Sequence, residues 1–210
     1  TVSLDALDEA TFAAITDSGH TVAAVLAGIE AAESVGLGPI KVNTVVKRGA
    51  NEGEILDLVE RFSSRDIATR FIEYMDVGTT NGWAMDDVVT ADEIRSLLTN
   101  LEPIPSQYPG EVAKRYRLPQ GGEVGLITSV TEPFCGDCTR ARLSADGHLY
   151  TCLFATSGLD LLTPMREGAT DAELVAMIES CWSERDDRYS EIRAEASPSR
   201  VRVEMSYIGG

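Results

Sequence analysis

The stretch 134–152, FCGDCTRARLSADGHLYTC, limits the possible folds of this chain more than any other. It holds three of the four cysteines, Cys135, Cys138 and Cys152, in the spacing C-x2-C-x13-C. Asp146-Gly147 lies between two segments of extended character, and an Asp-Gly pair in that position is typical of a β-hairpin turn. The predicted hairpin returns Cys152 to the loop of the other two cysteines. Two arginines, Arg140 and Arg142, follow Cys138 closely. The sequence therefore predicts that three thiols meet beside these two arginines.

Three uses of these cysteines compete. Four cysteines in 210 residues are too sparse for a disulfide scaffold. Structural zinc requires a fourth ligand, which would be His148 or Cys181. We expect His148 on the hairpin surface and Cys181 in core packing at the end of an amphipathic helix. An iron–sulfur cluster with three cysteine ligands and one open iron is the third use. Spacing alone favours zinc and cluster equally.

The first half of the chain alternates β-type and helical segments. This order predicts parallel strands joined by right-handed crossovers, with the chemistry at the C-terminal strand ends. The expected strands are 1–6, 40–46 and 67–75, and the expected helices are 9–15, 21–34, 51–62 (capped by Asn51) and 92–99.

The second half has a different character. Pro103, Pro105 and Pro109 form a linker-like stretch, so we place a domain boundary between regions 1–104 and 105–210. After it we expect antiparallel strands at 112–118 and 124–129, the cysteine hairpin, a helix at 172–182 and a final strand at 201–207. The predicted fold class is α/β, followed by an α+β region.

The net charge of −16 argues against nucleic acid and anionic membranes as partners. No apolar run approaches the roughly 20 residues of a membrane span. A local cationic pocket for one nucleotide remains compatible with an acidic surface. Sparse, grouped cysteines fit a reducing cytoplasm.

Four phrases occur together and in order: KVNTVV (Lys41–Val46), RFIEYMDVG (Arg70–Gly78), FCGDCTRARLSADG and the terminal MSYIGG. With them the chain resembles the GTP 3',8-cyclase family, radical S-adenosylmethionine (SAM) enzymes that open molybdenum cofactor biosynthesis. The resemblance covers essentially the whole chain, except that the family's N-terminal C-x3-C-x2-C motif is absent. The first residues of this chain are similar to a strand in the middle of the family's barrel. We therefore expect the C-terminal part of such an enzyme, with an incomplete TIM-type (β/α) barrel.

The resemblance implies a lyase that converts GTP to (8S)-3',8-cyclo-7,8-dihydroguanosine 5'-triphosphate through a SAM-derived radical. It also implies an auxiliary 4Fe-4S cluster on Cys135, Cys138 and Cys152. The residues it assigns to ligands are Lys41, Arg70, Arg140, Ala141 and Arg142 for GTP, Ser3 and Met75 for SAM, and Gly209 and Gly210 for a tail that enters the active site.

Residue chemistry bears on four of these assignments. Arg140 and Arg142 alternate with Ala141, so an extended segment places both guanidinium groups on one face as a clamp for phosphate. Lys41 is an unusual residue in a strand of this apolar type. Its side chain either extends to the rim of the sheet or pairs with a ligand. Arg70 either faces the nucleotide or pairs with Glu73.

Two rival functions stay open. One is a non-catalytic zinc-binding interaction module, and the other is a different radical SAM enzyme with an auxiliary cluster. In the favoured interpretation the chain is cytoplasmic, takes GTP as a small-molecule substrate and is compatible with a homodimer. Without the missing N-terminal part and its SAM-cleaving cluster, we expect the chain alone to be inactive and to expose a largely apolar edge at residues 1–7.

Overall fold

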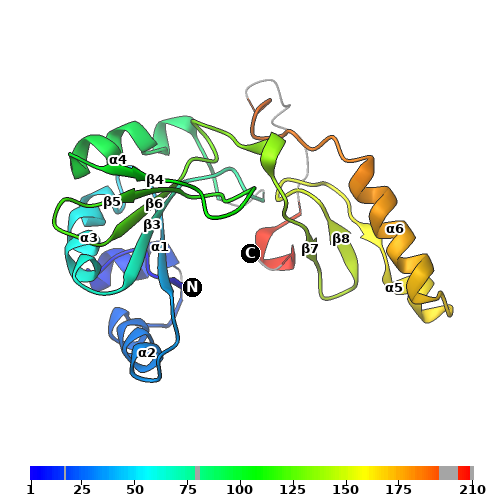
Figure 1. Ribbon diagram of the computed structural model, residues 1–210, viewed down its shortest axis with the longest axis horizontal. Helices are drawn as coiled ribbons and strands as arrows, with labels where there is room; N and C mark the ends of the chain where they lie inside the picture. Colours follow the sequence, from blue (N-terminus) through cyan, green and yellow to red (C-terminus); the bar gives the residue numbers. More distant parts are fainter. Residues whose placement is uncertain (17, 79–80, 194–202, 209–210) are drawn as a thin grey trace. The chain divides into compact units, whose positions relative to one another are not determined.

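The computed structural model describes residues 1–16, 18–78, 81–193 and 203–208. The chain divides into two compact units (Figure 1). Unit 1 comprises Thr1–Met75 and Trp83–Pro133, and unit 2 comprises Asp76–Gly82 and Phe134–Gly210. The units do not separate at residue 104, because strands on both sides of that position join one sheet.

Unit 1 is built on a six-stranded sheet in the order β1-β2-β3-β6-β5-β4. The first four strands are parallel to their neighbours, and β5 and β4 are antiparallel, which gives a mixed α/β architecture. The strands are β1 (Val2–Ser3), β2 (Ile40–Val46), β3 (Ile67–Glu73), β4 (Glu102–Ile104), β5 (Lys114–Arg117) and β6 (Glu123–Ile127). The helices are α1 (Glu9–Thr16), α2 (Val22–Ser34), α3 (Ile55–Ser63) and α4 (Ala91–Leu98).

Helix boundaries follow local capping chemistry. Thr21 caps α2 through a hydrogen bond from the Ala24 amide, and Thr90 forms a complete capping box with Glu93 at the start of α4. The predicted cap at Asn51 is wrong, since its side chain makes no capping bond. Its amide instead donates to the carbonyls of Asp5 and Val45, which ties the first segment to the end of β2.

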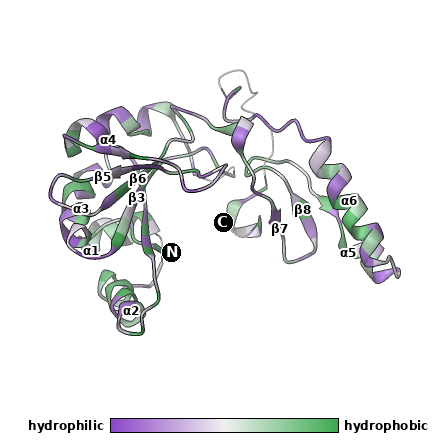
Figure 2. Cartoon of the chain, viewed as in Figure 1, coloured by the Kyte–Doolittle hydropathy of each residue, from purple (hydrophilic) through white to green (hydrophobic). Residues whose placement is uncertain are grey.

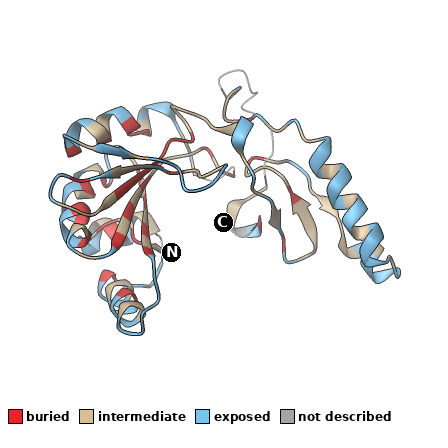
Figure 3. Ribbon diagram, in the orientation of Figure 1, coloured by how far each residue is buried: buried red, intermediate tan, exposed pale blue. Residues whose placement is uncertain are grey.

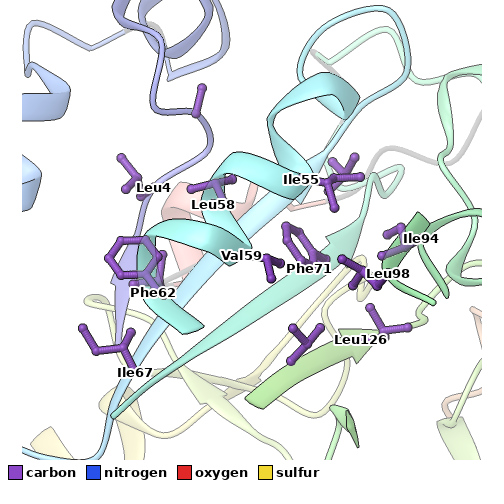
Figure 4. Packing of buried hydrophobic residues seen from close by; sticks show 14 of the residues in the cluster. Leu4, Ile55, Leu58, Val59, Phe62, Ile67, Phe71, Ile94, Leu98 and Leu126 are labelled. Carbon is purple, nitrogen blue, oxygen red and sulfur yellow. The ribbon is translucent and has the colours of Figure 1, made fainter. Parts of the chain in front are cut away.

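The core of unit 1 lies between one face of the sheet and the helices (Figure 4). In β2 and β3 buried residues alternate with half-buried ones, because successive side chains point to opposite faces. We call the face with the half-buried residues the open face. Full burial of an aliphatic or aromatic side chain contributes about 1.5–3 kcal/mol. The side chains of α3 that supply this burial are Ile55, Leu58, Val59 and Phe62.

The expected exposed edge at residues 1–7 is only partly present. β1 lies at the edge of the sheet, but Leu4 and Ala6 are fully buried in the core. The chain after β1 therefore turns inward and covers its own apolar residues.

Unit 2 contains a three-stranded antiparallel sheet of β7 (Arg142–Leu143), β8 (His148–Tyr150) and β9 (Leu159–Asp160). Helices α5 (Leu162–Arg166) and α6 (Asp171–Ser183) follow. A buried polar contact ties the unit's two segments together, because the Asp76 carboxylate accepts hydrogen bonds from the hydroxyl of Tyr189 and from Nε of Arg193.

Helix α6 begins with the Thr170–Glu173 capping box, as its sequence suggests. The expectation that Cys181 packs in a core is wrong, since α6 has no buried residue and Cys181 is half-buried. Apolar residues occur along this helix (Figure 2), although most of its residues are exposed (Figure 3).

The predicted final strand is also wrong where it falls within the described residues. Met205–Ile208 form a 3-10 turn, with Ile208 buried. Residues 201–202 and the predicted tail residues Gly209 and Gly210 lie outside the described residues. Among the described residues, the helices are too short or too polar to cross a membrane.

Candidate metal and anion site

The first two cysteines lie on one tight turn. Cys135–Asp137 form a 3-10 turn, in which the Cys138 amide donates to the Cys135 carbonyl at 3.2 Å. The C-x2-C spacing thus places both thiols on the same short loop of unit 2.

The predicted hairpin brings the third cysteine back. β7 and β8 are antiparallel, with Arg142 opposite Tyr150, and Cys152 follows two residues later. Gly147 in the turn has φ +79°, and a Cβ there would lie 2.6 Å from the Cβ of Leu162. Both observations favour glycine at this position. The hairpin prediction is confirmed.

The three thiols of the hairpin region are free and half-buried. The charge of Cys152 interacts with those of Cys135 and Cys138, so the three sulfur atoms lie within electrostatic reach of one another. Within the described residues, however, no group of three or more His, Cys, Asp or Glu side chains is arranged to hold a single metal ion. Thiolates that bind different irons of a cluster lie farther apart than ligands of one ion, so this donor set is compatible with a cluster.

Two of these thiols have different electrostatic surroundings. Burial alone raises the pKa of the Cys138 thiol, but hydrogen bonds from Arg140 and the charges of Arg140 and Arg185 outweigh it, so the pKa is lowered. Burial raises the pKa of the Cys152 thiol, and only a hydrogen bond from the Phe154 amide opposes this. Soft thiolates beside cations suit an iron–sulfur cluster or zinc.

The two predicted arginines lie at the same place. Arg140 Nη2 donates to Cys138 Sγ at 3.4 Å, and its guanidinium stacks over the Phe134 ring at 5.2 Å. Its Nε is buried without a hydrogen-bond partner among the described residues. Burial and the charge of Arg140 lower the pKa of Arg142, which lies within electrostatic reach of Cys138 and Cys152. Two cations held this close favour an anion between them. Ala141 between them is exposed.

Sequence reasoning missed one cation of this site. Arg185 contributes to the low pKa of Cys138, stacks over Trp182 at 4.5 Å and lies 3.6 Å from the carboxylate of Asp187. It comes after α6, far along the chain, and nothing in the local sequence distinguishes it from the other charges of the stretch 183–193.

The remaining predicted ligand residues belong to unit 1. Lys41 and Arg70 both line a cavity of about 430 Å³ within this unit. Among the described residues no ion pair involves either side chain, so the suggested Arg70–Glu73 pair is wrong. Glu73 points to the other face and accepts hydrogen bonds from Ala91 and Thr131. Ser3 is exposed in β1, and Met75 is half-buried just after β3.

Comparison with known proteins adds independent information. The family model described as Molybdenum Cofactor Synthesis C matches residues 67–191. The GTP 3',8-cyclase of Acidothermus cellulolyticus is 47% identical over 239 aligned positions, which cover 100% of this chain and 66% of that protein. The GTP 3',8-cyclases of Xanthomonas campestris pv. campestris and Staphylococcus saprophyticus are 49% and 44% identical, again over 100% of this chain, and over 62% and 64% of their own lengths.

The chain thus spans between 62% and 66% of the length of these curated relatives. The family match includes β3, the cysteine hairpin and α6, so it covers nearly half of unit 1 and most of unit 2. The chain belongs to the molybdenum cofactor synthesis family, and its relatives include curated GTP 3',8-cyclases.

Proposed function

We propose that the chain is the C-terminal part of a GTP 3',8-cyclase and provides its auxiliary 4Fe-4S site and much of its GTP site. The observation that carries the proposal is the meeting of three free thiols and two arginines on one turn and hairpin of unit 2. The identity of the relatives as GTP 3',8-cyclases supports the same assignment.

The proposal includes the finer fold of unit 1. Four adjacent parallel strands, with helices packed against one face and an open face on the other, are what part of a TIM-type barrel would contribute. The N-terminal part found in the radical SAM family would add the strands and the cluster that cleaves SAM. Ser3 and Met75 would then supply one side of the SAM pocket.

In this mechanism the chain's own residues bind and orient the substrate. Cys135, Cys138 and Cys152 would hold the auxiliary cluster, which supplies an iron able to coordinate the guanine end of GTP. Arg140 and Arg142 bind the triphosphate, because guanidinium groups stay charged and donate in pairs to phosphate oxygens.

Further contacts complete the proposed site. Lys41 and Arg70 supply further positive charge, and the backbone at Ala141 lies between the two arginines. The assignment of Gly209 and Gly210 to the active-site tail stays part of the proposal.

The proposal places the protein in the cytoplasm, where reducing conditions keep thiols free for metal. It names GTP as the small-molecule partner and extends to assembly as a homodimer.

Substitution of either hairpin arginine tests the GTP assignment. We expect Arg140→Ala and Arg142→Ala each to weaken GTP binding by about ten- to a hundredfold, because a charge-assisted hydrogen bond contributes about 1.5–3 kcal/mol. Isothermal titration of GTP into the cluster-loaded protein measures this.

Arg166→Ala is the matched control, since Arg166 is an exposed arginine of α5 in the same unit. Its GTP affinity should equal that of the unsubstituted protein. An unchanged GTP affinity in both hairpin variants would contradict the assignment of the triphosphate to Arg140 and Arg142.

A further inference from the structure

The segment that follows α6 returns to the cysteine hairpin of unit 2. The Asp187 carboxylate accepts a hydrogen bond from the hydroxyl of Thr151 at 2.5 Å, and Thr151 directly precedes Cys152. The same carboxylate oxygen lies 3.6 Å from Nε of Arg185. One carboxylate thus joins the returning arm of the hairpin to an arginine that lies just beyond α6.

Arg185 is fixed from a second side as well. Its guanidinium lies over the ring of Trp182 at 4.5 Å, and its backbone amide donates to the Trp182 carbonyl at 3.4 Å. Its side chain is 11% exposed, and arginine side chains are rarely buried to this extent unless they are paired. The positive charge of Arg185 is therefore held at a defined place beside the cysteine site.

The two charges of this pair act on different cysteines. The hydrogen bonds and the charge of Arg140 work against burial to lower the pKa of the Cys138 thiol, and the charge of Arg185 adds to that effect. Burial is the main cause of the raised pKa of the Cys152 thiol, and the charge of Asp187 raises it further. The positive member of the pair thus acts on the turn, and the negative member acts on the returning arm.

Groups that touch the ligands of a metal site orient those ligands and adjust the properties of the metal. For iron–sulfur clusters, nearby charges and hydrogen bonds are among the factors that set the reduction potential. We propose that Arg185 and Asp187 are positioning residues of the auxiliary cluster, which fix the arm that carries Cys152 and set the reduction potential of the cluster with two opposed charges. This inference rests on the proposed function and adds to it two residues outside the set of ligands.

Neutral variants of the two residues should shift the potential in opposite directions. A positive charge stabilises the reduced cluster, which is the more negative state, so Arg185→Gln should make the cluster harder to reduce. Asp187→Asn should make it easier to reduce, and the new amide oxygen can still accept from Thr151. We expect each substitution to change the ratio of reduced to oxidised cluster at a fixed potential by about three- to tenfold, where tenfold corresponds to about 59 mV for one electron.

The experiment is a potentiometric titration of the full chain, loaded anaerobically with its cluster and followed by electron paramagnetic resonance of the reduced cluster. The sequence has four cysteines and the proposed site uses three of them, so the signal has one source. Arg185→Lys keeps the charge and should keep the potential of the unsubstituted chain. Arg188→Gln is the matched control, because Arg188 lies in the same segment, pairs with Glu191 and has a side chain that is 68% exposed. Its potential should also stay unchanged.

Shifts that follow the sign of the removed charge support the inference, because the loss of a purely structural contact would not reverse sign between Arg185→Gln and Asp187→Asn. If Arg185→Gln does not retain its iron, the direction of the shift in Asp187→Asn gives the answer. Equal potentials in all loaded variants, or shifts of the same sign, overturn the inference. So does an Arg185→Gln variant that keeps its potential but binds inorganic tripolyphosphate at least tenfold more weakly, since Arg185 is then a phosphate ligand.

Failure of the proposed function gives a different result. An unsubstituted chain that holds no iron and sulfide after reconstitution contradicts the proposed function, and the inference fails with it. A loaded, unsubstituted chain whose potential is the same in Arg185→Gln and Asp187→Asn overturns this inference alone and leaves the proposed function intact.

Discussion

The Cys152→Ser variant is expected to retain little iron and sulfide after anaerobic reconstitution. In the proposed site Cys152 is the thiol that comes from the returning arm of the hairpin, and the turn of Cys135 and Cys138 alone offers two thiolates. Serine keeps the size of the side chain but replaces a soft thiolate by a hydroxyl, which binds iron poorly. Iron, sulfide and visible absorbance per chain measure the loss.

Cys181→Ser provides the matched control, because Cys181 is also half-buried and free in unit 2 but lies on α6. It should reconstitute as the unsubstituted protein does. Equal loss in both variants would contradict the ligand assignment. A colourless protein that binds zinc without sulfide would instead support a zinc-binding interaction module.

The second large effect is expected at Glu73, which is 1% exposed at the end of β3. One carboxylate oxygen accepts from the amides of Val130 and Thr131, at 2.8 and 2.9 Å. The other accepts from the Ala91 amide at 3.1 Å and from the Thr131 hydroxyl. This carboxylate joins β3 to the start of α4 and to the loop after β6.

Glu73→Gln should lower the free energy of unfolding by about 2–4 kcal/mol, because the new NH₂ group faces donors that lose their acceptor. That corresponds to a fall in melting temperature of roughly 5–15 °C for a chain of this size. Circular dichroism against temperature measures it.

Glu60→Gln, at an exposed position of α3, should change the melting temperature little. If Glu73→Gln and Glu60→Gln have the same melting temperature, the Glu73 carboxylate does not join β3 to α4 and to the loop after β6 as described.

Local features of the chain could be predicted from its sequence. The Asp146-Gly147 turn, the Thr90 and Thr170 caps and the alternation in β2 depend on residues close in sequence. For the same reason the spacing of Cys135, Cys138 and Cys152 was enough to bring the thiols together.

Long-range contacts could not be predicted in this way. The partners of Glu73 come from two distant segments, and the side chain of Asn51 bonds to distant Asp5 instead of capping a helix. Arg185 reaches the cysteine site only through the fold of unit 2. The amphipathic pattern of α6 led to the wrong expectation that its apolar face is buried. Periodicity predicts that a helix has an apolar face, but it does not predict whether another segment of the chain packs against that face.

The most direct measurement of the central claim is turnover with SAM, GTP and a reductant, followed by mass spectrometry of the nucleotides. It compares this chain alone with a fusion to the part of the Acidothermus cellulolyticus relative that lies outside the match. The account predicts 5'-deoxyadenosine and a 3',8-cyclised GTP from the fusion, and neither from the chain alone. A fusion that carries its iron and yet forms no cyclised nucleotide would contradict it, and so would 5'-deoxyadenosine from the chain alone.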